Sequence, residues 1–187
     1  MSRMQTFAVL TLLTLVASGC RTDGGTQVGV EQDKAFPPSL AGRWQSDLDG
    51  WQFTFEPDGD IASAVLGLGQ TEIEPGEKTV VPTRTGEEAV FEPGPWTVHY
   101  EPATRELTVR IVMDHVRVPM GGNVIEGAST DILTGPVSPA TGVWQAQWTA
   151  FTRYTVATAE GGAYDLSTDP TYGETKSLTF ERTATND

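Results

Sequence analysis

The chain has 187 residues, a length that favours one folded domain. Hydrophobic residues make up 38% of it and aromatic residues 9%, which is enough for a core and too much for a fully disordered chain. The formal charge of −13 excludes the basic surface that a nucleic-acid binder needs, and it opposes adhesion to anionic lipid headgroups. Such acidity is expected of an exported protein that stays soluble and monomeric.

The first nineteen residues predict a cleaved signal peptide. Arg3 supplies a positive charge, and the apolar stretch 7–17 is too short for a spanning helix, which needs about 20 residues. The following Ala17-Ser18-Gly19-Cys20 resembles the lipobox of bacterial lipoproteins. That resemblance implies cleavage before Cys20, lipid on its sulfur and acylation of the new amino terminus. The alternative is an ordinary secretory signal followed by a chance cysteine.

Cys20 is the only cysteine, so no internal disulfide can form. Because Arg21 rather than Asp follows it, the lipoprotein resemblance favours the outer membrane over the inner membrane of the bacterial envelope. Residues 20–38 show no periodic apolar pattern, and they contain Gly24-Gly25 and Pro37-Pro38. We therefore predict a lipidated cysteine with a flexible tether over 20–38.

Residues 39–187 predict one β-barrel domain. Trp51, Phe53 and Phe55 alternate with polar residues, which is typical of a half-buried strand, and the Pro57–Asp60 segment favours a turn. The same alternation predicts about eight strands near 42–47, 50–56, 60–66, 89–100, 106–118, 122–134, 142–151 and 176–183. Longer loops are expected over 67–88 and 152–175. The predicted fold is all-β, an antiparallel meander closed as a barrel, with a β-sandwich as the alternative.

Two short motifs at the ends of this domain carry a family resemblance. Gly42-Arg43-Trp44 opens the first strand, and Phe180-Glu181-Arg182 closes the last. The pairing resembles lipocalin-like barrels, which begin with a Gly-x-Trp strand and use a late Arg that packs over this Trp. The resemblance implies that the Arg182 guanidinium lies over the Trp44 indole, within about 6 Å of the ring centroid.

Metal and catalytic motifs are weak. His99 and His115, with Asp114 or Glu101, could bind zinc, but surface histidines are far commoner. The carboxylates at the first hairpin suit turns better than a calcium site; they are Asp47, Asp49, Asp58 and Asp60. Ser129 lies near Asp131 in sequence, but no placed base supports it as a nucleophile. We therefore predict no enzyme, no metal and no cofactor.

The tryptophans have two interpretations, as ligand contacts or as core. The candidate ligand or barrel-end residues are Trp44, Arg182, Trp96, Trp144 and Trp148. An eight-stranded barrel is just wide enough to be filled by side chains or to hold one small ligand, and so much aromatic bulk favours a filled interior. We therefore expect a membrane-anchored envelope lipoprotein with a structural or partner-binding domain. The alternative is a small module that binds an apolar ligand.

Overall fold

The computed structural model describes residues 25–31, 34–67, 71–165 and 175–183. The chain is all-β, with 63% strand and 3% helix, which confirms the predicted fold class. Among the described residues no helix has the length and apolarity needed to cross a bilayer. The expected signal peptide and Cys20 lie outside the described ranges.

The described strands belong to one sheet. In chain order they are β1 (Gln27–Val30), β2 (Gly42–Ser46), β3 (Gln52–Phe55), β4 (Ile61–Val65), β5 (Glu72–Ile73), β6 (Thr79–Pro82), β7 (Glu88–Pro93), β8 (Thr97–Glu101), β9 (Glu106–Met120), β10 (Asn123–Ser138), β11 (Val143–Ala157), β12 (Ala163–Asp165) and β13 (Thr175–Arg182), with a 3-10 turn, η2 (Pro38–Leu40), before β2.

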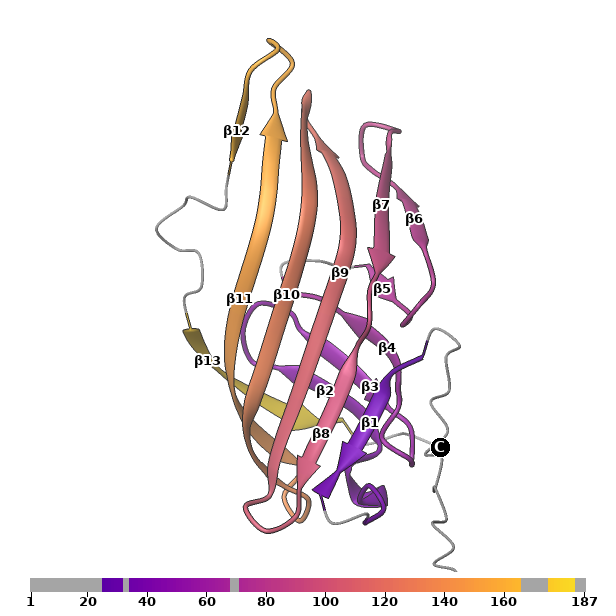
Figure 1. Ribbon diagram of the computed structural model, residues 1–187, viewed down its shortest axis with the longest axis vertical. Coiled ribbons are helices and arrows are strands. Elements are labelled where there is room, and N and C mark those ends of the chain that lie inside the picture. The colour runs from indigo at the N-terminus through magenta and orange to yellow at the C-terminus, as the bar shows by residue number, and fades with distance from the viewer. Residues whose placement is uncertain (1–24, 32–33, 68–70, 166–174, 184–187) are drawn as a thin grey trace, which may run out of the picture.

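The sheet curls into two layers. Its main path runs β1-β8-β9-β10-β11-β13-β2-β3-β4-β5, and all pairs are antiparallel except the parallel pair β1–β8. The long strands β9, β10 and β11 run along the molecule, while β13, β2 and β3 cross behind their lower half (Figure 1). No pairing joins β5 to β1 in the described part of the chain, so the predicted barrel is an open, mixed sheet there.

The inward faces follow the predicted alternation in most strands. Trp51 and two residues of β3, Phe53 and Phe55, are buried, as predicted. The same holds for the alternating positions before and along β8 and β9, namely Trp96, Val98, Tyr100, Leu107, Val109, Ile111 and Met113. Because successive strand side chains point to opposite faces, this pattern puts one apolar face of each strand into a common core.

Alternation fails at two β-bulges. On β4 the buried positions are Ile61 and Ala64, because the register with β3 shifts between Thr54 and Phe55. On β9 the buried set moves from Met113 to Val116, because an extra residue lies opposite β10 at this point. A bulge inserts one residue into one strand, so every later side chain changes face.

Several strand boundaries differ from the prediction. The expected strand 89–100 is two strands, β7 and β8, separated at Gly94-Pro95, where proline cannot donate to a ladder. The expected loop 67–88 contains β5 and β6, and the expected loop 152–175 contains the end of β11 and β12. These short strands were not predicted because they have no long alternating pattern. They form by pairing with neighbouring strands.

The amino-terminal segment is part of the sheet. β1 pairs with β8 from Gln27 opposite Thr97 to Val30 opposite Tyr100, and it lies beside β8 in Figure 1. The Thr26 hydroxyl accepts a hydrogen bond of 3.2 Å from the Ile61 amide at the start of β4. Residues 26–30 therefore bridge β8 and the β3–β4 hairpin, across the gap where a barrel would close.

Phe36 fixes the same segment to the core. It is 3% exposed, and its ring centroid lies 6.2 Å from those of both Phe55 and Tyr100. Gly59, in the β3–β4 turn, has a φ of 95°, and a Cβ placed there would lie 2.7 Å from the Phe36 ring and 2.9 Å from Val28. Glycine is therefore required at this turn by both conformation and space.

This arrangement differs from the flexible tether expected over 20–38. The described residues 25–31 and 34–38 supply a strand and a buried aromatic ring, so the folded domain begins before residue 39. Periodicity does not reveal this strand and buried ring, because the apolar residues are few and widely spaced. Gly29 and polar residues separate Val28, Val30 and Phe36.

We expect Phe36→Ala to lower the free energy of unfolding by about 3–5 kcal/mol, the usual cost of emptying an aromatic core site. Urea unfolding followed by tryptophan fluorescence measures this change. Leu48→Ala is the control, because Leu48 is 57% exposed and its truncation should stay within about 0.5 kcal/mol. Equal stability of Phe36→Ala and the wild type would show that the amino-terminal segment does not seal the sheet.

Candidate functional site

Three of the predicted tryptophan contacts are core residues. Trp44, Trp96 and Trp144 are fully buried, and each indole N–H donates to a backbone carbonyl. The acceptors are Leu40 at 2.8 Å, Val112 at 3.0 Å and Gly135 at 3.2 Å, respectively. Buried indoles with satisfied N–H groups are structural elements rather than an open ligand surface.

Arg182 does not stack on Trp44. The two residues pair directly across β13 and β2, so the predicted neighbourhood of the first and last strands is correct. However, the Arg182 side chain is exposed, and its guanidinium donates to the Ser39 carbonyl instead of lying over the ring. Leu40, next to that carbonyl, is fully buried and accepts the Trp44 N–H. Arg182 therefore holds the η2 turn that covers Trp44.

Trp148 differs from the other predicted tryptophans. It is half-buried on β11, and its indole N–H donates to Oδ1 of Asp131 on β10 at 2.9 Å. Ser129 Oγ lies 3.4 Å from the other carboxyl oxygen, Oδ2. With Tyr154 and Trp51 these residues form the Asp131 cluster, defined as Trp51, Ser129, Asp131, Trp148 and Tyr154.

Strand register explains why these residues meet. Ser129, Asp131 and Leu133 share the inward face of β10, because they alternate with Thr130 and Ile132. The register with β11 pairs Leu133 with Trp148, Asp131 with Ala150, Ser129 with Thr152 and Gly127 with Tyr154. Trp148 and Tyr154 therefore lie on the same face as Asp131, within diagonal reach across the strands.

Asp131 is a buried acid without a basic partner. It is 7% exposed, and no basic side chain of the described residues forms an ion pair with it. Burial raises the pKa of Asp131 to about 6, and the hydrogen bonds from Trp148 and Ser129 oppose this rise. Burial also raises the pKa of Tyr154; a hydrogen bond with Ser129 opposes this, and the charge of Asp131 adds to it.

Trp51 adds a second unsatisfied polar group. It is 1% exposed and packs edge-to-face on Trp148, with ring centroids 5.5 Å apart. Its indole N–H has no hydrogen-bond partner among the described residues. A Cβ on Gly67 would lie 2.3 Å from this nitrogen, so only glycine fits against the ring. An unpaired buried donor costs about 1–3 kcal/mol.

A lysine already lies on the aromatic part of the cluster. Lys176, on β13, places its Nζ 5.4 Å from the Trp148 ring centroid, and the same Nζ is 3.4 Å from Asp49 Oδ2. The Trp148 ring therefore attracts a cation in the folded protein.

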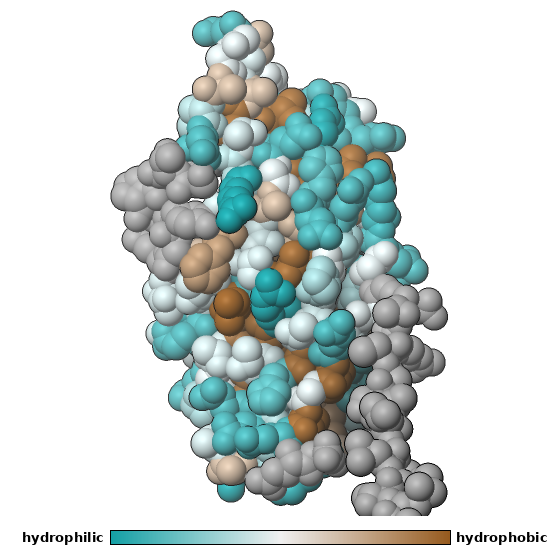
Figure 2. Space-filling model, in the orientation of Figure 1, coloured by the Kyte–Doolittle hydropathy of each residue, from teal (hydrophilic) through white to brown (hydrophobic). Residues whose placement is uncertain are grey.

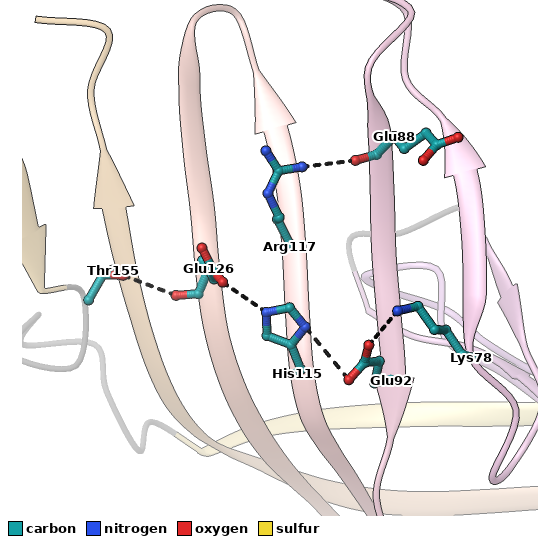
Figure 3. A network of polar contacts seen from close by, with 7 residues as sticks. All are labelled: Lys78, Glu88, Glu92, His115, Arg117, Glu126 and Thr155. Atoms are coloured by element: carbon teal, nitrogen blue, oxygen red, sulfur yellow. Dashed lines mark hydrogen bonds and ion pairs between the residues drawn. The ribbon is translucent and has the colours of Figure 1, made fainter. Parts of the chain in front are cut away.

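The histidines lie on the outer face, away from this cluster. Figure 3 shows His115 between Glu92 and Glu126, with Lys78 on Glu92. His115 Nε2 is 2.9 Å from Glu126 Oε1, and Lys78 Nζ is 2.7 Å from Glu92 Oε1. The hydrogen bond from Lys78 lowers the pKa of Glu92. Such exposed pairs contribute little to stability because water screens them, so the network is a cross-strand ladder on the surface.

The zinc and serine-nucleophile hypotheses gain no support from this geometry. Among the described residues no three His, Cys, Asp or Glu side chains are grouped to hold a metal. His99 is exposed on β8, and His115 is bonded to Glu126, so neither contacts Ser129 as a base. Ser129 contacts Asp131 and Tyr154 instead.

The aspartates of the first hairpins have structural roles. Asp47 Oδ1 accepts from the Thr179 amide at 2.9 Å, and Asp58 Oδ1 accepts from the Asp60 amide at 3.3 Å. Asp49 has a φ of 58° and pairs with Lys176. These contacts support the turn interpretation, because short carboxylates satisfy nearby amides and tolerate the left-handed conformation.

Sequence analysis missed the Asp131 cluster, because the pattern of residues 123–134 does not show which of their side chains point into the core. The signal that could have found it is the order Ser129, Asp131, Leu133, which places two polar residues in line with the core position Leu133. Polar residues at inward positions mark either a satisfied core network or a site.

Comparisons with known proteins identify no relative of this chain. No family model, no curated protein and no solved structure matches the chain.

We expect Asp131→Asn to stabilise the protein more at high pH than at low pH. Asp131 binds a proton more tightly in the folded state, so its contribution to stability is full below pH 4 and is lost as pH rises through about 6. The shift of about 2 pKa units corresponds to about 3 kcal/mol at pH 8 and under about 1 kcal/mol at pH 4. Urea unfolding at both pH values measures this. A stability difference that is the same at pH 4 and pH 8 would contradict it.

Proposed function

We propose that this protein is a bacterial lipoprotein of the cell envelope, anchored by lipid on Cys20 and acting without catalysis as a structural or partner-binding module. The outer membrane is favoured over the inner membrane by Arg21. The lipobox-like Ala17-Ser18-Gly19-Cys20 and the short apolar stretch before it support the anchor. A lipocalin-like barrel is the finer description that we propose for the curled sheet. The pairing of Arg182 on β13 with Trp44 on β2 supports it, whereas the Arg182 contact with the Ser39 carbonyl does not.

The filled interior is the observation that carries this proposal. Trp44, Trp96 and Trp144 are fully buried, and Phe53 and Phe180 are fully buried with them. Trp144 stacks on Phe180 with ring centroids 4.7 Å apart. An apolar ligand held as in a hollow barrel would need the space that these rings occupy. The geometry therefore favours a structural or partner-binding role over the alternative, an apolar-ligand module.

The docking of β1 would keep the domain near the membrane. Only residues 21–26 separate Cys20 from Gln27, the first residue of the sheet. The seven residue steps from Cys20 to Gln27 span at most about 25 Å when extended. An anchored domain of this kind would stay close to the bilayer, because its linker is short. This position suits contact with a fixed envelope partner.

One end of the sheet is the better candidate for that contact. Three of the exposed large hydrophobic side chains are Val80 on β6, Met120 before the β9–β10 turn and Tyr164 on β12. The β9–β10 turn and β12 lie at the upper end in Figure 1, whereas β6 lies at the opposite edge of the long strands, beyond β7. Figure 2 shows the broad face of the long strands as hydrophilic with small, separate hydrophobic areas, so that face is a weaker candidate.

We expect Cys20→Ser to abolish labelling by a radioactive or clickable fatty acid and to move the protein into the soluble fraction. Loss of the thiol removes the atom that carries the diacylglycerol in the proposed anchor. Fractionation with and without detergent measures this change. Should Cys20→Ser still partition with membranes to the same extent, the proposed anchor is wrong.

We expect photo-crosslinking residues at Met120 and Tyr164 to give a discrete adduct with an envelope protein in cells. The exposed apolar side chains at this end are the surface that a partner would cover. The matched control is Thr104, which is exposed in the β8–β9 turn at the opposite end. The same adduct at all three positions, or none at any, would argue against a partner at the upper end.

A further inference from the structure

The carboxylate of Asp131 is the least satisfied charged group of the described core. Buried carboxylates are normally paired with a base or held by several donors. Asp131 receives one short hydrogen bond, from Trp148, and one long contact of 3.4 Å, from Ser129. An ionised carboxylate has about four acceptor positions, so acceptor capacity remains in a site that water scarcely reaches.

A second polar group of the same cluster is also unsatisfied. The Trp51 indole N–H has no hydrogen-bond partner among the described residues, although its ring is 99% buried and packs on Trp148. Native structures leave few such groups, and each one requires an explanation. A donor group of a ligand would complete the Asp131 carboxylate, whereas an ammonium has no lone pair to accept from the Trp51 N–H, which stays unpaired.

The inward face of β11 is more exposed in its middle than at its ends. Trp144 and Ala146 are buried, Trp148, Ala150, Thr152 and Tyr154 are half-buried, and Val156 is buried again. The first change in exposure comes near Thr149, where the described pairing of β11 with β13 ends opposite Thr175. Asp131 pairs with Ala150 and so faces the more exposed middle of β11, while Ser129, the next inward residue of β10, is as buried as Asp131.

The chemistry of the cluster selects a cation. An anion would be opposed by Asp131 and by the net charge of −13. A metal ion would need several ligands, and nowhere among the described residues do three His, Cys, Asp or Glu side chains come together. Aromatic faces attract ammonium groups, and the Trp148 ring already has Lys176 over it, whose own charge is paired with Asp49.

We propose that the Asp131 cluster binds the ammonium group of a small organic amine. The ammonium donates to the free positions of the Asp131 carboxylate, and the apolar body of the amine packs against Trp148 and Tyr154. This site is separate from the proposed partner surface and does not depend on the lipid anchor.

The test uses benzylamine as the probe and benzyl alcohol as its neutral match, with the full chain in detergent at pH 8. We expect benzylamine to shift the Trp148 indole NMR signal saturably, with benzyl alcohol at least ten-fold weaker. Asp131→Asn should weaken benzylamine binding at least ten-fold. Asp58→Asn, in an exposed turn, should bind as the wild type does.

Circular dichroism and tryptophan fluorescence establish that both Asn variants are folded, so loss of binding can be assigned to the missing charge. The proposal is overturned if benzylamine gives no saturable shift up to 20 mM, or if benzyl alcohol binds equally well. It is also overturned if folded Asp131→Asn binds benzylamine like the wild type. None of these results bears on Cys20 lipidation or on crosslinking at Met120.

Discussion

The packing of Trp144, Phe180 and Phe53 is the contact on which the two-layer arrangement depends. Trp144 comes from the long front strands, Phe180 from β13 and Phe53 from β3, so the three rings join the layers at one point. Their centroids lie 4.7, 5.7 and 6.2 Å apart, in tilted or offset geometries that aromatic pairs prefer. Because these rings fill the space between the layers at this point, the sheet curls there around side chains rather than around a hollow.

Alternation in the sequence was enough to predict the class of fold, since long hairpin strands such as β9 and β11 expose a period of two over many residues. It failed where one inserted residue changes the facing, as between Met113 and Val116. It also failed for β1, because a four-residue parallel strand depends on its partner β8 rather than on its own pattern. Closure was overestimated for the same reason: local periodicity carries no information about whether the two ends of a sheet meet.

The candidate site was predicted only in part. Trp148 was among the expected ligand contacts, but the sequence could not separate it from Trp144, four residues earlier on the same face. The difference is three-dimensional, because Phe180 and Phe53 pack on Trp144, whereas Trp148 lies near the end of the described β11–β13 pairing, opposite Lys176. The stacking of Arg182 on Trp44 was wrong although the strand pairing behind it was right. At a sheet end, a long flexible side chain reaches an unpaired carbonyl, that of Ser39, as readily as it reaches a ring.

The cost of Asp131 must be offset by the rest of the core. A buried acid whose pKa rises by about 2 units destabilises a neutral-pH protein by about 3 kcal/mol, against a typical total stability of about 5–15 kcal/mol. A leucine at this inward position would avoid that cost and extend the apolar face from Leu133. Phe36 and the aromatic contact at Phe53 supply stability on the scale needed to tolerate the acid. The amine that we propose for Asp131 would give this costly carboxylate a partner, whereas the unpaired Trp51 N–H would gain none from an ammonium.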